Sequence, residues 1–335
     1  MSTQVMAVPR PEDVLRLLAG RRFGDITLDG CRVVGPIQSG PRSHLFRCTG
    51  GEIAGAMALK FCLTADGERD FATAQGQHAA LERIAGLAAR SATTVRVVRA
   101  LGLVEEHACL ATEWIEGRPV TATLGGSMTG EAEIRNSANA VGCWLRGFHA
   151  MHRLADRPMS CAVMLANLEQ QTPAVHALAS NQRFAAGHAA LAQTAAVVAA
   201  IPVPIAHHHG DFKAENLMMT GDGLVGFDIT AHWDDAVMLD LAQFLRDLTF
   251  CAWRPSGWLL GRRHRLIAEA FLDGYGAAGH PAWRGPLRWA QLHGLLRFWI
   301  EVASAPADPI RNSYERYRFE QCVAAATDAL PAAGG

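Results

Sequence analysis

A polar segment at residues 207–216 limits the possible folds of this chain more than any other feature of the sequence. It reads His-His-His-Gly-Asp-Phe-Lys-Ala-Glu-Asn, and Val-Gly-Phe-Asp-Ile follows at 225–229. Between them, Thr220-Gly-Asp-Gly223 has the composition of a hairpin turn. A loop followed by a tight hairpin returns Asp228 to the neighbourhood of Asn216. The pattern therefore predicts that the carboxylates of Asp211 and Asp228 and the amide of Asn216 lie in one site.

The chain has a different pattern on each side of residue 117. Before it, short apolar runs broken by Gly, Pro and Ser predict antiparallel strands within 26–36, 43–48, 54–63, 95–105 and 109–115, with one helix at 68–85. After residue 130, helical spacing predicts helices at 131–154, 162–179, 183–200, 236–251, 262–278, 284–303 and 314–329. We therefore expect an α+β fold with a small antiparallel-sheet domain at 1–117 and a larger helical domain at 118–335.

Lysine is almost absent from the sequence. Of 31 basic residues only Lys60 and Lys213 are lysines, so arginine serves nearly everywhere that a surface charge suffices. A lysine offers a compact ammonium group, which acts as a point charge. Lys60 lies on a predicted strand, opposite the face formed by Met57, Leu59, Phe61 and Leu63. A charge there indicates that the second face of the sheet lines a cleft.

The residue types in these segments suit phosphoryl transfer. That chemistry needs a carboxylate beside the attacking hydroxyl, oxygen ligands for Mg²⁺ and a cation on the phosphates. Asp211, Asn216 and Asp228 supply hard oxygen atoms of the kind that magnesium prefers. The two lysines supply cations.

These motifs resemble those of the aminoglycoside phosphotransferases and choline kinases, which have a protein-kinase-like fold. His209-Gly-Asp-Phe-Lys-Ala-Glu-Asn216 is similar to their catalytic loop, and Phe227-Asp228 to their metal-binding Asp. Asp240-Leu-Ala is similar to the start of their following helix. Leu110-Ala-Thr-Glu-Trp-Ile-Glu-Gly117 looks like their hinge, and Ala58-Leu-Lys60 like the strand that carries the ATP lysine. The resemblance covers roughly residues 30 to 250, with the motifs in the same order.

The resemblance implies a role for each matching residue. Asp211 would be the catalytic base, and Lys213 would contact the γ-phosphate. Asn216 and Asp228 would bind Mg²⁺. Lys60 would hold the α- and β-phosphates of ATP, and the backbone of Glu113 and Ile115 would bind adenine. The segment Gly35–Ser43, with Ser39 and Gly40, lies where the phosphate-covering loop belongs, and we expect His209 to organise the loop.

Two features favour a small-molecule kinase within this group. Gly210 stands where protein kinases usually have an arginine, and only eleven residues separate Asp228 from Asp240, too few for an activation segment. The implied reaction is transfer of the γ-phosphate of ATP to a hydroxyl of an amino alcohol, a sugar or an aminoglycoside-like compound. The alternatives are a non-catalytic nucleotide-binding pseudokinase and a protein kinase. All of Lys60, Asp211, Asn216 and Asp228 are present, which does not favour the pseudokinase.

The sequence leaves the partner of Lys60 open. The spacing in the family indicates Gln77, whereas helical phase places Glu68 and Glu82 on the inward face beside Phe71. The acceptor is open too. The tryptophans could form an aromatic box for a quaternary ammonium or simply pack helices, and Asp234 and Asp235 could bind an amine or form an exposed turn. Four arginines (Arg254, Arg262, Arg263 and Arg265) would instead suit an anionic acceptor. Neither the oligomeric state nor a preference for ATP over GTP can be predicted.

The composition argues against several other classes of protein. The formal net charge is −1, so the chain lacks the basic surplus of a non-specific nucleic-acid binder. No apolar run approaches the roughly 20 residues of a spanning helix. The eight cysteines are scattered without a C-x-x-C pair, which predicts reduced core cysteines in a cytoplasmic protein. Three adjacent histidines, His207 to His209, point in different directions and do not predict a metal site.

Overall fold

Two compact units make up the chain in the computed structural model, which describes residues 9–40, 42–51, 53, 55–93, 95–126, 128–171, 178, 180–230, 233–251, 257–304 and 309–330. The sheet unit comprises residues 1–120, 209–211 and 215–233. The helical unit comprises residues 121–208, 212–214 and 234–335. The chain therefore returns to the sheet unit for the hairpin that carries Asp228. The predicted α+β fold class, with an N-terminal antiparallel sheet and a helical C-terminal region, is confirmed.

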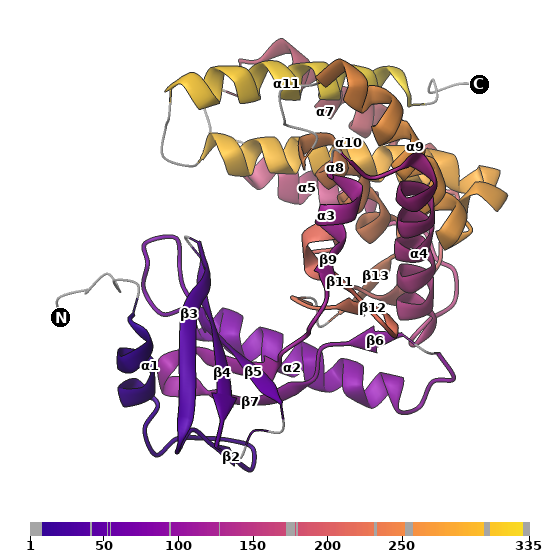
Figure 1. The fold of residues 1–335 in the computed structure, drawn as a ribbon. Coiled ribbons are helices and arrows are strands. Elements are labelled where there is room, and N and C mark those ends of the chain that lie inside the picture. Colours follow the sequence, from indigo (N-terminus) through magenta and orange to yellow (C-terminus); the bar gives the residue numbers. More distant parts are fainter. Residues whose placement is uncertain are drawn as a thin grey trace. The chain divides into compact units, whose positions relative to one another are not determined.

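A five-stranded antiparallel sheet in the order β3-β4-β5-β8-β7 forms the centre of the sheet unit (Figure 1). The strands span β3 Cys31–Gly40, β4 Ser43–Gly50, β5 Ala56–Cys62, β7 Ala100–Val104 and β8 Cys109–Glu113. A short helix, α1 Pro11–Leu17, and two short strands, β1 Arg22–Phe23 and β2 Ile26–Thr27, precede the sheet. A 3-10 turn at Glu105–His107 joins β7 to β8.

Alternation along β5 sorts its side chains onto two faces. Met57, Leu59 and Phe61 are fully buried in a core that α1 and β1 also enter through Val14, Leu18 and Phe23. The long helix α2, Phe71–Ala88, lies on the other face, where Ala74 packs against Cys62. Lys60 lies, as predicted, on the face opposite Met57, Leu59 and Phe61, and it shares that face with α2.

A second, smaller sheet in the order β6-β12-β11-β9 completes the sheet unit. Its strands are β6 Arg96–Val97, β9 Arg118–Pro119, β11 Leu217–Thr220 and β12 Gly223–Gly226. β11 and β12 form the predicted hairpin, whose turn is closed by the pair Thr220–Gly223. Because β9 follows the end of β8 and pairs with β11, this sheet ties the hairpin to the chain that leaves the large sheet.

The helical unit contains the longest helices. They are α3 Val120–Leu124, α4 Glu131–Ala150, α5 Cys161–Gln171, α7 Gln182–Ala199, α8 Met238–Cys251, α9 Gly257–Tyr275, α10 Arg284–Ala303 and α11 Pro309–Asp328. Short 3-10 turns at Ala277–Gly279 and Pro281–Trp283 connect α9 to α10. Strands β10 Ile205–His207 and β13 Asp234–Ala236 pair antiparallel on either side of the catalytic-loop motif in the sequence. The helix predicted at 162–179 is observed as α5 to Gln171, and residues 172–177 and 179 of that prediction lie outside the described residues. The ends of the other predicted helices differ from the observed ends by a few residues.

Aromatic side chains fill the core of the helical unit. Trp144 of α4 stacks on Phe212, and Phe212 also contacts Phe244 and Phe271. The indole N–H of Trp289 in α10 donates to the carbonyl oxygen of Leu191 in α7, and Trp299 of α10 stacks on Phe319 of α11. Trp144, Trp289 and Trp299 therefore pack helices together, which was one of the two interpretations of the tryptophans. Trp253 and Arg254 lie outside the described residues.

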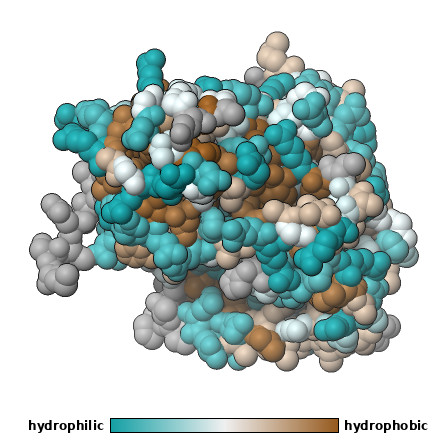
Figure 2. All heavy atoms as spheres, turned by 90° about the horizontal axis from the view of Figure 1, so that it is seen from below, coloured by the Kyte–Doolittle hydropathy of each residue, from teal (hydrophilic) through white to brown (hydrophobic). Residues whose placement is uncertain are grey.

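Large hydrophobic side chains are exposed at separate places on the surface. On the face drawn in Figure 2, hydrophobic and hydrophilic residues occur side by side. The exposed large hydrophobic residues come from many elements: Val34, Ile37, Phe71, Met128, Val163, Val197, Trp233 and Tyr317. None of the helices in the described part of the chain has the length and apolar character that crossing a membrane requires.

Helices α4 and α9 cross at two glycines. A Cβ atom on Gly142 would lie 2.1 Å from the carbonyl oxygen of Phe271, and one on Gly274 would lie 2.0 Å from that of Asn139. Backbone atoms cannot yield as the end of a side chain can. The close approach of the two backbones thus requires glycine at both positions.

We expect Gly142→Ala to lower the free energy of unfolding by about 1–3 kcal/mol or more, because the added methyl group pushes two packed helices apart. Gly294→Ala in α10 is the matched control, since no atom lies within 4 Å of its added Cβ. That variant should be neutral or stabilising by up to about 1 kcal/mol, the helix propensity gained. Chemical denaturation measures both. A Gly142→Ala protein as stable as the wild type would contradict the crossing.

Candidate active site

Lys60 lies on β5 and its ammonium group donates to Asp228 Oδ1. The lysine side chain is 17% exposed and that of Asp228 37%, so the ion pair is partly shielded from solvent. The two residues are 168 positions apart in the sequence. The structure thus brings together two of the residues that the motifs predicted to converge. Their roles stay predictions.

Asp228 follows β12 and has a positive φ of 57°. A non-glycine residue in this left-handed region is uncommon and costs of the order of 1–3 kcal/mol unless its surroundings hold it. Here the neighbours are fixed. The Phe227 N–H donates to the carbonyl oxygen of Asn216 at 3.1 Å, and the Val98 N–H to that of Gly226 at 2.9 Å. Strain that is held in this way often accompanies a functional residue.

Asn216 and Asp211 are also in direct contact. The Asn216 amide Nδ2 donates to the backbone oxygen of Asp211 at 2.8 Å and to its carboxylate Oδ2 at 3.0 Å. Asn216 is buried, whereas Asp211 is half-buried. The Thr230 N–H donates to the carbonyl oxygen of His209 at 3.0 Å. The catalytic-loop motif and the segment after the hairpin are therefore joined at both ends.

The donor set in this part of the sheet unit fits a magnesium ion. With its Nδ2 bound to Asp211, Asn216 retains its amide oxygen as a ligand, and Asp228 offers a carboxylate. Hard oxygen atoms are what Mg²⁺ takes, and it commonly uses one or two protein ligands plus substrate phosphates. Within the described residues, no group of three or more His, Cys, Asp or Glu side chains is arranged to hold a metal. A magnesium ion here would depend on the nucleotide for its other ligands.

The predicted hinge begins at the end of β8. The N–H groups of Glu113 and Trp114 donate within the sheet unit, to the carbonyl oxygens of Arg99 and Ala56, both at 3.0 Å. Ile115 follows, and its backbone N–H makes no hydrogen bond within the described residues. Gly117 ends the segment against β11, since a Cβ there would lie 2.5 Å from the carbonyl oxygen of Met219. The segment is thus held at both ends, and a nucleotide-binding role for Ile115 stays a prediction.

Ser39 and Gly40 lie at the tip of the β3–β4 hairpin. Ser39 pairs with His44 and Gly40 with Ser43, and Ser39 Oγ is 2.9 Å from His44 Nδ1. The segment expected to be a phosphate-covering loop is therefore largely strand, with an irregularity between Val34 and Gln38. Pro41 lies outside the described residues.

Lys213 is half-buried in the stretch 212–214, which belongs to the helical unit. Its neighbour Phe212 is fully buried among aromatic residues of that unit. A buried aromatic anchor beside Lys213 fixes this part of the loop within the helical unit.

A buried network of histidines surrounds Asp240, and sequence reasoning missed it. Asp240 is fully buried, with His149 Nε2 at 3.0 Å from Oδ2 and His208 Nδ1 at 3.3 Å from Oδ1. His149 Nδ1 contacts the Tyr275 hydroxyl at 2.9 Å, and His208 Nε2 lies 3.0 Å from the carbonyl oxygen of Ala236. Burial lowers the pKa of His149 from its usual value, although Asp240 opposes the change. The only signal in the sequence was Asp240-Leu-Ala itself.

Asp234 and Asp235 are engaged within the helical unit. Asp234 lies 3.4 Å from His152 Nε2 and 3.5 Å from His207 Nδ1. Asp235 Oδ1 accepts from the Ala236 N–H. Arg262 pairs with Glu131, and Arg263 donates to the backbone of Thr123 and Gly126. These contacts give each residue a structural explanation and leave the acceptor unidentified.

The predicted helical phase of α2 is wrong. Glu68 precedes the helix, the Glu82 side chain is 66% exposed and Phe71 is 47% exposed. The inward face instead carries Ala74, Gln77, Ala80, Leu81, Ile84 and Leu87. Gln77 is 7% exposed, and its Oε1 has no hydrogen-bond partner among the described residues. Of the three candidates for Lys60, only Gln77 presents a buried polar atom on this face.

The thiol of Cys62 lies on the same face of β5 as Lys60. Burial raises its pKa to about 11, with Lys60 opposing the change. Cys62 is therefore a neutral thiol at physiological pH. The described cysteines, Cys31, Cys48, Cys62, Cys109, Cys143, Cys161 and Cys322, are all free.

Comparison with known proteins places the chain in a family. Residues 34–290 match the phosphotransferase enzyme family, APH, so the chain belongs to that family. The match includes every residue of the candidate site, from Ser39 to Asp228. A comparison with curated proteins gave no match.

Three solved structures illustrate the similarity in fold. Amicoumacin kinase hAmiN, in complex with AMP-PNP, Ca²⁺ and Ami, is 13% identical with a TM-score of 0.61, over 96% of this chain and 95% of that one. A choline/ethanolamine kinase family protein from Mesorhizobium loti is 17% identical with a TM-score of 0.54, over 88% and 92%. An aminoglycoside-3'-phosphotransferase of type VIII is 22% identical with a TM-score of 0.51, over 85% and 98%. The kinase-like fold is confirmed.

We expect Gln77→Leu to weaken ATP binding roughly fivefold without lowering the melting temperature. Burying an unpaired amide oxygen costs about 1–3 kcal/mol, so removing the oxygen should not destabilise the nucleotide-free fold. ATP binding should weaken because the oxygen would pair with Lys60 when nucleotide binds. Glu82→Gln on the exposed face of α2 is the control and should change neither quantity. Calorimetric titration and thermal unfolding measure the two effects. Unchanged ATP affinity in Gln77→Leu would leave the amide without a role in binding.

Proposed function

We propose that this member of the family is an ATP-dependent kinase that transfers the γ-phosphoryl group to a hydroxyl of a small molecule. The observation that carries the proposal is the set of contacts within the sheet unit: Lys60 with Asp228, and Asn216 with Asp211. These four residue types are the ones that phosphoryl transfer requires, and Asn216 is also held by a hydrogen bond to the backbone oxygen of Asp211.

Asp211 is the catalytic base in this proposal. Its carboxylate orients the acceptor hydroxyl and takes its proton as the new oxygen–phosphorus bond forms and the bond from the γ-phosphorus to ADP breaks. The amide of Asn216, 3.0 Å from Asp211 Oδ2, fixes the direction of the carboxylate. Lys213 lies two positions further on and contacts the γ-phosphate.

The nucleotide is held by residues of the large sheet. Lys60 binds the α- and β-phosphates, exchanging part of its contact with Asp228 for them. The backbone of Glu113 and Ile115 binds adenine, and the tip of the β3–β4 hairpin, with Ser39 and Gly40, covers the phosphates. Asn216 and Asp228 would hold Mg²⁺, which would neutralise negative charge on the phosphates.

The two alternatives account for fewer of the observations. A pseudokinase would be expected to have lost one of the four residues, and all four are present, in two contacting pairs. A protein kinase needs an activation segment between Asp228 and Asp240, and residues 234–236 of that short interval form β13. The named relatives include kinases of choline or ethanolamine, aminoglycosides and amicoumacin, which supports a small-molecule acceptor in an amino alcohol, sugar or aminoglycoside-like class.

We expect Asp211→Asn to reduce turnover by about 10²–10⁴-fold with little change in ATP affinity, because the amide keeps the shape but cannot accept the proton. The measurement uses the best acceptor from a panel of amino alcohols, sugars and aminoglycosides, or else slow hydrolysis of ATP. Asp222→Asn, in the exposed hairpin turn, is the matched control and should retain full turnover. Wild-type turnover in Asp211→Asn would show that Asp211 is not the base.

We expect ATP to raise the melting temperature more with Mg²⁺ than with EDTA, since the metal adds binding energy that the folded state alone gains. Asp228→Asn should abolish most of this difference, because asparagine tolerates the positive φ but removes the carboxylate. Asp222→Asn should preserve the difference. The same response to ATP with and without Mg²⁺ in the wild type would contradict the assigned ligands.

A further inference from the structure

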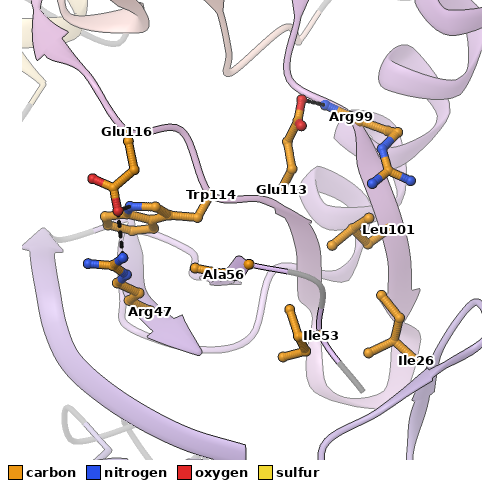
Figure 3. A pocket seen from close by; sticks show the side chains of 10 residues that line it. Ile26, Arg47, Ile53, Ala56, Arg99, Leu101, Glu113, Trp114 and Glu116 are labelled. Carbon is orange, nitrogen blue, oxygen red and sulfur yellow. Dashed lines mark hydrogen bonds and ion pairs between the residues drawn. The ribbon is translucent and has the colours of Figure 1, made fainter. Parts of the chain in front are cut away.

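A pocket of about 510 Å³ opens in the sheet unit at the end of the large sheet (Figure 3). None of Lys60, Asp211, Asn216 and Asp228 lines it. Its walls come from β2, β4, β7, the start of β5 and the end of β8: Ile26, Arg47, Ile53, Gly55, Ala56, Arg99, Leu101, Glu113, Trp114 and Glu116. The volume is in the range of small-molecule sites.

The apolar wall of this pocket belongs to the face of the sheet opposite Lys60. Glu113 pairs with Met57, and residues directly opposite each other in a sheet project to the same face. Met57 is in the buried core, against which Leu101 and Ile53 also pack. Figure 3 shows these two residues with Ile26 on one side of the pocket and the Arg47–Trp114–Glu116 cluster on the other. A ligand would therefore meet an apolar wall that continues into the core.

Three of the four charges in the pocket are already compensated. Arg47 Nη2 donates to Glu116 Oε1 at 2.5 Å, and its guanidinium lies 5.1 Å from the Trp114 ring centroid. The same Glu116 oxygen accepts from Trp114 Nε1 at 3.1 Å. Glu113 Oε2 lies 3.6 Å from Arg96 Nη2, and its Oε1 accepts from the backbone N–H of Arg99 at 3.0 Å. Both carboxylates therefore have cationic or N–H partners.

Arg99 carries the remaining charge. Its guanidinium is exposed and makes no hydrogen bond or ion pair within the part of the chain that the structure describes. One uncompensated cation beside an apolar wall suits one negative charge on an apolar body. A phosphate, with up to two charges, would also have to approach Glu113 and Glu116 and would be repelled more strongly.

We infer that this pocket is a second small-molecule site, which binds an apolar or aromatic monocarboxylate. The carboxylate pairs with the Arg99 guanidinium, and the apolar body lies against Ile26, Ile53 and Leu101. The site uses the side chains of Glu113 and Trp114, whereas the nucleotide is proposed to use backbone groups of the hinge. It can therefore be occupied with or without nucleotide.

The experiment uses indole-3-acetate as probe and indole-3-acetamide as its uncharged match, with the full chain and no nucleotide. Ligand-observed NMR or calorimetric titration gives the two dissociation constants. We expect saturable binding of the acetate. The acetamide should bind roughly fivefold more weakly, because this ratio corresponds to the free energy of one exposed ion pair. Arg99→Gln should remove this preference, and high salt should reduce it. Ile26→Ala should weaken both probes.

Arg90→Gln is the control, because Arg90 is an exposed arginine of the same unit that does not line the pocket. It should bind both probes as the wild type does, and thermal unfolding checks that every variant is folded. Equal affinity for acetate and acetamide, or an unchanged preference in Arg99→Gln, would overturn the inference. Competitive displacement by AMP-PNP would do so too, since the probe would then occupy the nucleotide site. None of these results depends on whether the chain is a kinase.

Discussion

The contact between Lys60 and Asp228 closes a ring within the sheet unit. From Lys60 the ring passes across the β5–β8 pairing, along the hinge to β9, across the β9–β11 pairing and through the hairpin to Asp228. Every link except the last is backbone hydrogen bonding or covalent chain. A half-buried ammonium group without a partner would be costly, so the ion pair holds the hairpin at one position relative to the large sheet. It adds to the backbone hydrogen bonds of Phe227 and Gly226 that hold the neighbours of Asp228 at its positive φ.

The buried network around Asp240 imposes a comparable constraint on the helical unit. A fully buried carboxylate is tolerated only with strong donors, and His149 and His208 supply them from two different elements. Burial lowers the pKa of His149, and its two ring nitrogens contact Asp240 Oδ2 and the Tyr275 hydroxyl, so both polar atoms of the buried ring have partners. His208 directly precedes the catalytic-loop motif His209–Asn216. The network therefore fixes the backbone where the chain leaves the helical unit for the loop.

The sequence was sufficient to predict which residues lie close together, because its motifs combine unusual residues with fixed spacing. A lysine in an apolar strand, a loop of polar residues and a tight turn before Phe227-Asp228 each restrict the chain strongly. The structure accordingly brings Lys60 to Asp228 and Asn216 to Asp211. The prediction of which face of α2 is buried was wrong because the helix lacks such distinctive residues. Its many alanines, Ala72, Ala74, Ala79 and Ala80 among them, give no distinct apolar stripe, so Phe71 and Leu81 suggested a face that Phe71 does not in fact bury.

Contacts between distant segments account for what the sequence could not predict. The Asp240 network joins α4, α8, α9 and His208, which follows β10. The second pocket combines β2, β4, β5, β7 and β8, and neither site has a local pattern in the sequence. Side-chain chemistry is informative only once these positions are known. At the hinge a planar guanidinium, Arg47, stacks on Trp114 and pairs with Glu116, which an ammonium group could not do equally well. In the sheet unit a single ammonium group, Lys60, meets one carboxylate oxygen of Asp228, a contact that needs no planar alignment. The near-absence of lysine elsewhere is therefore physically consistent with its retention at position 60.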